Sequence, residues 1–218
     1  PQALRTALAT SGYSERVEVA PSGERIAYGI GCGVETGGLV NLESAQVRIN
    51  PDGSVAVKSG MSSQGQGQFT TYAQVCAETL GVSLANVSVR LGDTGLMPFG
   101  RGAFAARGAV IGANAVFSAT QSLRAKVLEC AAILLQCRAG ELDIENGSIR
   151  RADGSATDLT IGQIAQAVQP GGAFYDGDAV LEVSTVYEAK QVLTSGFSVH
   201  VAKVRLDPQT GLFCIEDY

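Results

Sequence analysis

Two short runs of glycine and small or amide residues, each placed directly before a helical pattern, constrain the fold of this chain most strongly. The first is Ser63–Gln68, which reads Ser-Gln-Gly-Gln-Gly-Gln, and the second is Gly100–Gly108. A helix N-terminus carries free backbone N–H groups and a positive dipole end, and glycine lets an anion approach closely. Two such junctions favour a long, charged ligand with several polar groups. The alternative is that small residues here only let helices pack closely on a sheet, and both interpretations stay open.

The segments around these junctions predict a mixture of strands and helices. Residues 44–49 and 54–59 alternate with a period of two around the turn Asn50–Gly53, which predicts a hairpin. Apolar residues three and four apart predict helices over 68–80, from about 116 to 138, and over 160–168. Further strands are predicted at 25–33, 86–91, 180–187, 196–205 and 212–215, and a small hairpin is predicted over 141–149, with its turn at Asn146-Gly147. Because strands and helices are mixed and do not alternate regularly, we expect an α+β fold with mixed sheets and packed helices.

Composition excludes several classes of function. The net charge of −5 argues against a protein that tracks nucleic-acid phosphates, so we expect no nucleic-acid partner. No apolar run approaches the length of a membrane span and no signal peptide is visible, so we expect no membrane span and a cytoplasmic location. The chain starts at Pro1 and stops at Tyr218 inside an apparent strand, so we expect both ends to be cut from something longer.

Metal-ligating residues are sparse. The five cysteines form an odd count without a close pair, which fits neither a disulfide framework nor a zinc site and predicts reduced, mostly buried thiols. The single histidine, His200, lies in an apparent strand and is expected to be an ordinary strand residue. We therefore predict no metal held by protein ligands.

Three familiar motifs do not fit their contexts. The run 100–105 formally matches the dinucleotide-binding fingerprint, but a loop separates it from the preceding strand, and no second strand ends in an acidic residue about 20 positions on. The run 64–67 lacks the lysine and hydroxyl residue of a phosphate-binding NTPase loop. No serine has a histidine nearby in the sequence, so no nucleophile and base pair stands out.

At these junctions the chain resembles the large, molybdopterin-binding subunit of the molybdenum hydroxylases, the family of xanthine dehydrogenase, aldehyde oxidase and aerobic carbon monoxide dehydrogenase. The segments that carry the resemblance come in the family's order and span nearly the whole chain: Gly29–Gly38 with Glu35, Ser44–Ile49, Ser63–Gly67 with Thr70–Gln74, Gly92–Thr94, Pro98–Gly100, the Arg107 segment, and Phe197–Gly211 with its Asp-Pro-x-Thr-Gly turn. The glutamine–glycine segment is most similar to the carbon monoxide dehydrogenase-like branch of bacterial three-subunit enzymes.

The resemblance implies a fold, a cofactor and a set of site residues. The fold would be a two-layer α/β sandwich of the molybdopterin-binding domain type, with a molybdopterin-binding subdomain over 1–138 and a second α+β subdomain over 139–218, truncated at its C-terminus. The cofactor would be molybdopterin cytosine dinucleotide, whose dithiolene holds the molybdenum. The pterin and the oxo face of the molybdenum would contact Gln64, Gly65, Gln66, Gly67 and Gln68, and the side toward the pyrophosphate would contact Ala105, Ala106, Arg107 and Gly108.

The resemblance also implies an activity and partners for the intact enzyme. That enzyme would hydroxylate a small substrate, or oxidise carbon monoxide, with water as the oxygen source. Its electrons would pass to a [2Fe-2S] small subunit and an FAD-binding medium subunit. The family's catalytic glutamate would lie beyond Tyr218 in the remainder of the large subunit. We therefore expect no catalytic residue in this chain, no activity for it alone, and no cofactor in the isolated chain.

One departure from the family pattern supports a rival hypothesis. Hydroxyl residues usually flank the arginine, whereas here the flanking residues are Ala106 and Gly108. Alanine and glycine at these positions keep the backbone N–H donors but lack the two side-chain hydroxyl donors. The rival is a non-catalytic binding or assembly module that keeps the fold and has lost the cofactor. The intact run Gln64–Gly67 favours the enzyme.

Overall fold

The computed structural model describes residues 2–97, 99–175, 177, 180–190 and 194–218, so Pro98 of the Pro98–Gly100 segment lies outside the described residues. The chain divides into two compact units. The smaller unit consists of Pro1–Thr36 with Ser195–Tyr218, and the larger consists of Gly37–Thr194. Strands outnumber helices in both units, and the predicted α+β class is confirmed.

The larger unit is built on a four-stranded sheet with the strand order β5-β4-β3-β9. Its strands are β3 (Leu42–Ile49), β4 (Val55–Ser59), β5 (Val87–Leu91) and β9 (Leu181–Glu188). β4 and β9 flank β3 in antiparallel orientation, and the register that places Val47 opposite Val57 confirms the predicted hairpin. β5 runs parallel to β4. A parallel pair needs a long crossover connection, and helix α2 supplies it here.

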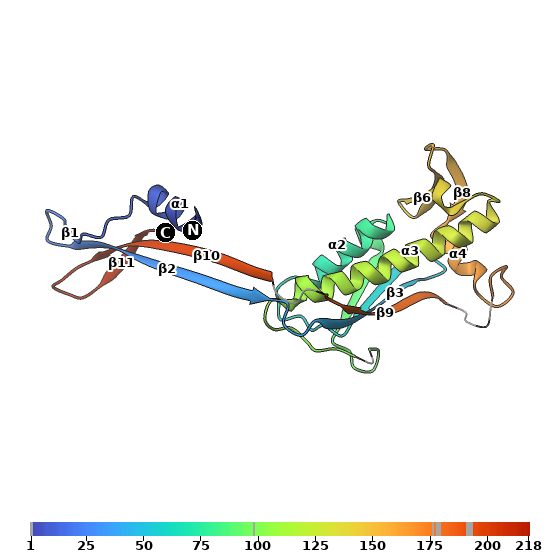
Figure 1. Ribbon diagram of the computed structural model, residues 1–218, viewed down its shortest axis with the longest axis horizontal. Coiled ribbons are helices and arrows are strands. Elements are labelled where there is room, and N and C mark those ends of the chain that lie inside the picture. Colours follow the sequence, from blue (N-terminus) through green and yellow to red (C-terminus); the bar gives the residue numbers. More distant parts are fainter. Residues whose placement is uncertain (1, 98, 176, 178–179, 191–193) are drawn as a thin grey trace. The chain divides into compact units, whose positions relative to one another are not determined.

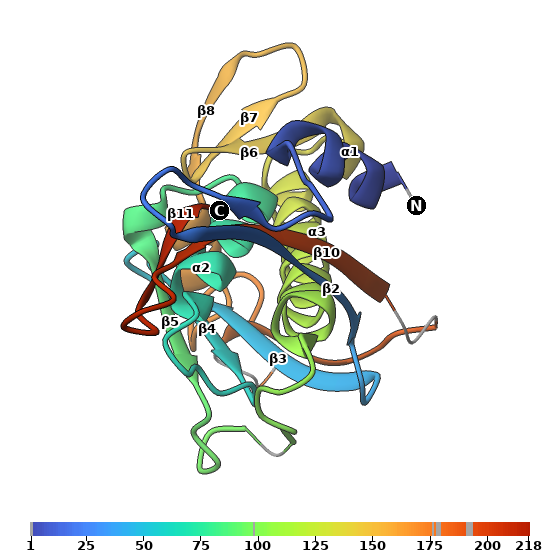
Figure 2. The ribbon, with the colours of Figure 1, turned by 90° about the vertical axis from the view of Figure 1, so that its left-hand side faces the viewer.

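Two helices cover one face of this sheet, α2 (Gln68–Leu80) and α3 (Asn114–Leu134) (Figures 1 and 2). Alternation along β3 turns Ala45, Val47 and Ile49 toward the helices, and all three are buried. The helices contribute the buried side chains Tyr72, Cys76, Leu80, Val116, Leu123 and Val127. This core has one helical and one sheet layer, as the resemblance implied. A π-helix, η2 (Gly108–Ala113), leads directly into α3, which ends before the predicted residue 138.

A small second sheet follows α3 in the same unit. It has the order β6-β7-β8 and consists of β6 (Leu142–Glu145), β7 (Ser148–Arg151) and β8 (Ala156–Thr160). Helix α4 (Ile161–Ala167) begins after Thr160, and short 3₁₀ turns, η1 (Leu84–Asn86) and η3 (Ala139–Glu141), precede β5 and β6. Because β9 pairs with β3 and α4 packs on α3 and β3, residues on both sides of position 138 belong to one compact unit. The compact units therefore do not divide at the boundary expected there.

The smaller unit contains α1 (Gln2–Ser11) and a sheet with the order β1-β2-β10-β11. Its strands are β1 (Glu18–Val19), β2 (Arg25–Gly37), β10 (Thr194–Leu206) and β11 (Phe213–Asp217). Among the described residues of this unit, Ile26 is the only hydrophobic side chain that is buried. His200 lies in β10, where its Nδ1 is 2.7 Å from the hydroxyl of Tyr218, so it is a strand residue as expected.

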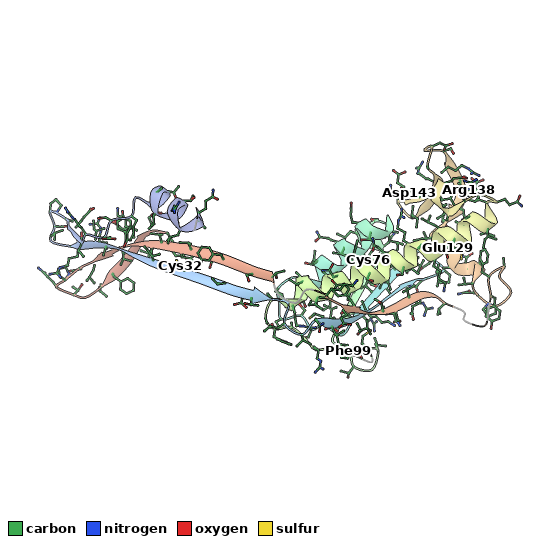
Figure 3. All side chains as sticks on the ribbon, viewed as in Figure 1. Cys32, Cys76, Phe99, Glu129, Arg138 and Asp143 are labelled. Carbon is green, nitrogen blue, oxygen red and sulfur yellow. The ribbon has the colours of Figure 1, made fainter. Side chains whose placement is uncertain are left out.

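The five cysteines are free thiols. Cys76 is buried, Cys130 and Cys137 are half-buried, and Cys32 and Cys214 are exposed. Figure 3 labels Cys76 on α2 and Cys32 on β2. The expectation that most of them are buried is wrong, because β2 and β11 leave their cysteines uncovered. Within the described ranges, no helix has both the length and the apolar character needed to cross a bilayer.

Candidate functional site

The two glycine-rich junctions line a single cavity of about 400 Å³ in the larger unit. The first junction and the helix that follows it contribute Gln64, Gln66, Gln68, Thr71 and Tyr72, and the second contributes residues 103–109. All predicted site residues therefore line this cavity except Gly65 and Gly67, which lie between the glutamines in the chain. The volume is typical of a site for a small molecule or cofactor.

The first junction ends in an uncapped helix N-terminus. Gly67 is the N-cap of α2 with φ 80°, and Gly65 has φ 98°, values that favour glycine over residues with a side chain. Among the described residues, no side chain caps the first turn of this helix. The first backbone N–H groups of α2 are therefore available to a ligand, and the helix dipole favours a negative one.

Two glutamine side chains hold the junction in shape. Oε1 of Gln66 accepts hydrogen bonds from the backbone N–H of Gln64 (2.6 Å) and the hydroxyl of Ser63 (3.3 Å). Nε2 of Gln64 donates to the carbonyl of Ala103 at 3.3 Å. This last bond ties the first junction to the second across the cavity.

The second junction contains two residues with unfavourable backbone conformations. Ala105 has φ 45° and Ala106 has φ 51°, a left-handed region that costs roughly 1–2 kcal/mol for a residue with a Cβ. The backbone N–H of Gly38 donates to the carbonyl of Ala105 at 3.0 Å and helps to hold this shape. Conformations of this kind persist where the surrounding structure enforces them, and they cluster at functional sites.

The side chain of Arg107, the next residue, is fully buried and helps to hold this backbone conformation. Its Nε and NH2 donate to the carbonyls of residues 39, 40 and 42, and its NH1 donates to the carbonyl of Gly102 and to Oε2 of Glu43. Every guanidinium nitrogen is thus engaged inside the chain. Arg107 lines the cavity, and its side chain organises the loops around it.

Glu43 is the partner that the sequence pattern missed. Its side chain is fully buried, and its Oε2 lies 2.8 Å from NH1 of Arg107 and accepts the backbone N–H of Arg101 at 3.3 Å. The predicted strand began one residue later, at Ser44. The alternation of side chains along the strand could have indicated this role, because residue 43 lies on the same inward face as Ala45 and Val47. An acidic residue on a buried face needs a buried partner.

Tyr72 anchors the start of the π-helix η2. Its hydroxyl donates to the carbonyl of Gly108 at 2.8 Å, and a Cβ at Gly112 would overlap that hydroxyl. Burial raises the pKa of the Tyr72 hydroxyl well above its usual range, and the nearby carboxylate of Glu43 adds to this effect. Tyr72 is therefore a neutral donor. π-Helical turns of this kind occur frequently at functional sites.

Gln68 is the lining residue with an unmet hydrogen-bonding requirement. It is only 5% exposed, and its Oε1 has no hydrogen-bond partner among the described residues. Buried amide groups are nearly always paired. An enclosed, unpaired amide beside an uncapped helix N-terminus fits a site that is completed by a polar ligand.

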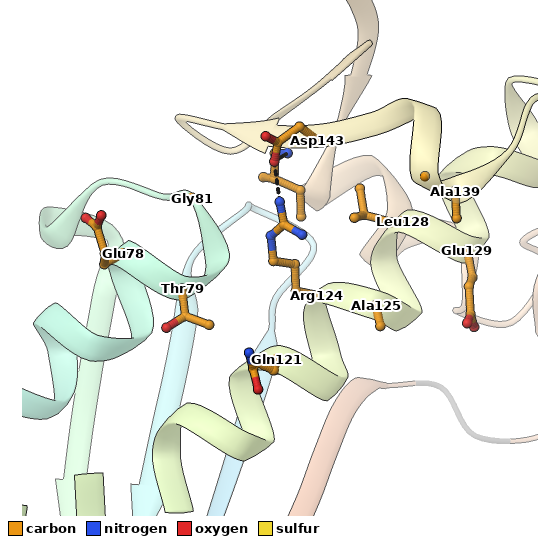
Figure 4. A pocket seen from close by; sticks show the side chains of 12 residues that line it. Glu78, Thr79, Gly81, Gln121, Arg124, Ala125, Leu128, Glu129, Ala139 and Asp143 are labelled. Atoms are coloured by element: carbon orange, nitrogen blue, oxygen red, sulfur yellow. Dashed lines mark hydrogen bonds and ion pairs between the residues drawn. The ribbon is translucent and has the colours of Figure 1, made fainter. Parts of the chain in front are cut away.

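A larger groove of about 700 Å³ lies at the C-terminal end of α2 and is a weaker candidate. Helices α2 and α3, η3 and β6 line it, and an ion pair between Arg124 and Asp143 crosses it (Figure 4). The other charged groups in it, Glu78 and Glu129, are exposed to solvent. Water and the ion pair therefore satisfy its charges, and nothing in it requires a ligand. No group of three His, Cys, Asp or Glu side chains in the described part of the chain could hold a metal ion.

Comparison with known families identifies the chain. A family model described as a molybdopterin cofactor-binding domain matches residues 6–218. The chain belongs to this family. The description of this family agrees with a polar cavity at a helix N-terminus.

Relatives of this molybdopterin cofactor-binding domain include chains of two dehydrogenases. The 6-hydroxypseudooxynicotine dehydrogenase complex subunit gamma of Paenarthrobacter nicotinovorans is 29% identical over 96% of this chain and 26% of its own length. The carbon monoxide dehydrogenase large chain of Hydrogenophaga pseudoflava is 31% identical over 80% of this chain and 21% of its own length. The chain thus spans about a quarter of these relatives.

Solved structures agree in fold. The crystal structure of quinoline 2-oxidoreductase from Pseudomonas putida 86 matches with a TM-score of 0.76 and 29% identity, over 100% of this chain and 28% of that one. A Cu,Mo-CO dehydrogenase matches with a TM-score of 0.79 at 24% identity, over 99% of this chain and 30% of that one, which supports the fold alone. The resemblance to molybdenum hydroxylase large subunits is confirmed.

Proposed function

We propose that this chain forms the molybdopterin-binding part of the large subunit of a molybdenum hydroxylase, which oxidises a small substrate with water as the oxygen source. The observation that carries the proposal is the cavity in which both glycine-rich junctions meet. Within the described residues, its wall holds a buried amide oxygen without a partner and a helix N-terminus without a side-chain cap. In a member of this family, that combination supports binding of the molybdenum cofactor.

The residues of the chain would hold the cofactor in different ways. Backbone N–H groups at the start of α2 would bind an anionic or carbonyl oxygen, and the amide of Gln68 would pair with a neighbouring polar group. Residues 105–108 would contribute backbone, because the Arg107 side chain is engaged with Glu43 and four carbonyls. When bound, the cofactor supplies the redox chemistry of molybdenum.

The finer parts of the proposal follow from the family resemblance. The cofactor would be the cytosine dinucleotide form of molybdopterin, and catalytic residues would come from the remainder of the large subunit. An FAD-binding medium subunit and a [2Fe-2S] small subunit would take the electrons. The assembly would be cytoplasmic.

Metal and nucleotide analysis of the intact protein, purified with its partner subunits from cells that make the cofactor, tests this proposal. We expect near-stoichiometric molybdenum, and CMP on acid hydrolysis. Release of another nucleotide would overturn the cytosine assignment alone. A folded complex without molybdenum would contradict the proposal and support a binding or assembly module that has lost the cofactor.

A further inference from the structure

We propose that Gln68 and Gly108 form a matched pair, in which the absence of a side chain at position 108 lets the Gln68 amide reach the cavity and bind the cofactor. This inference rests on the proposed function, because the ligand it invokes is the molybdopterin cofactor.

The space around Gly108 shows why the pair is matched. A Cβ at this position would overlap Nε2 of Gln68 and lie 3.2 Å from its Cδ, and the nearest atoms all belong to this one side chain. Gly108 has no positive φ, so its backbone conformation accepts alanine. The Gln68 side chain is therefore the obstacle to a larger residue at 108, and its flexible end can move aside without disturbing the backbone.

Three other polar side chains of the cavity wall already make hydrogen bonds inside the chain. The hydroxyl of Tyr72 donates to Gly108, and the hydroxyl of Thr71 donates to the carbonyl of Gly67. The Arg107 guanidinium is held by Glu43 and backbone carbonyls. Gln68 is enclosed, and its Oε1 has no partner in the described part of the chain. Because an amide can donate and accept, this group can pair with either kind of cofactor atom.

A double-mutant cycle on the intact, cofactor-loaded protein tests the pair, with two readouts: the rate of molybdenum loss during dialysis and the midpoint of thermal unfolding. Gly108→Ala should displace the Gln68 amide and speed molybdenum loss about threefold to tenfold, the equivalent of one hydrogen bond. Its unfolding midpoint should stay at the wild-type value, because only a side-chain end moves. Gln68→Ala should speed the loss by a similar factor.

The decisive comparison is the double variant. In the Gln68→Ala background, Gly108→Ala should add no further loss, because its effect acts through the missing amide. Gly140→Ala is the matched control, since a Cβ there meets nothing within 4 Å, and it should behave as the wild type.

Several outcomes would overturn the pair. These are fully additive effects of the two substitutions, wild-type retention of molybdenum in either single variant, or a large fall in the unfolding midpoint of Gly108→Ala. If the wild-type protein itself carried no molybdenum, the proposed function would fail together with this inference. Wild-type loading with unaffected variants would overturn the inference alone.

Discussion

Replacement of Glu43 by glutamine is expected to lower the free energy of unfolding by about 3–5 kcal/mol, because it breaks a buried ion pair and leaves one charge uncompensated. Both side chains of the Glu43–Arg107 pair are fully buried, and the separation of Oε2 and NH1 is 2.8 Å. Glutamine preserves the shape of the side chain and removes its charge. The buried guanidinium of Arg107 would then face only neutral groups.

The effect should extend to the cavity, because Arg107 also binds the carbonyls of residues 39, 40, 42 and 102. Replacing both partners by apolar residues is therefore not expected to restore stability here, since those carbonyls would lose their donor. Equilibrium denaturation by urea measures the change.

An exposed ion pair in the same unit provides the control. Asp143→Asn breaks the pair with Arg124, in which the two side chains are 61% and 32% exposed, and should cost less than about 1 kcal/mol. If Glu43→Gln cost no more than Asp143→Asn, the buried pair would not be what holds the second junction in place.

The substitution Gly60→Ala is expected to destabilise the protein by about 1–3 kcal/mol through overpacking. A Cβ at Gly60 would overlap the carbonyl oxygen of Phe99 and the Cα of Gly100, and it would lie 2.8 Å from Oε1 of Glu43. Two of these neighbours are backbone atoms, which cannot move aside as a side-chain end can. The Phe99 carbonyl is further fixed by the hydroxyl of Ser44.

This close crossing joins the end of β4 to the start of the second junction. Gly60 has no positive φ, so the cost of alanine comes from space alone and not from backbone strain. Gly140→Ala, at a position with open space, is the matched control for the loss of glycine flexibility. Equal unfolding free energies for the two variants would show that the backbone of residues 99 and 100 does not pack closely against Gly60 at the end of β4.

Local patterns in the sequence were sufficient for the elements that position the site. Period-two alternation identified β3 and β4, and three- and four-residue spacing identified α2 and most of α3. The two junctions were recognisable because glycine directly before a helix allows either a close approach of the backbone or a positive φ. Gly65 and Gly67 both have a positive φ. That the junctions meet in one cavity follows from the parallel crossover, which no local pattern encodes.

The features that the sequence did not reveal depend on pairs of residues far apart in the chain. The burial of the Arg107 side chain could not be read from the sequence, because its partner, Glu43, lies 64 residues away. The pairing of β9 with β3, which joins residues beyond 138 to the first sheet, is equally remote. The π-helix at the start of α3 is in contact with Tyr72 of α2, whose hydroxyl donates a hydrogen bond to the carbonyl of Gly108.

Hydrogen exchange of the intact protein, prepared with and without the molybdenum cofactor, tests most directly whether the two junctions hold it. The cofactor should slow amide exchange in residues 64–70 and 103–109, which form the cavity, and leave the remote turn at Asn50–Ser54 unchanged. Unchanged exchange in both cavity segments, or protection confined to the groove around Arg124 and Asp143, would contradict cofactor binding between the junctions.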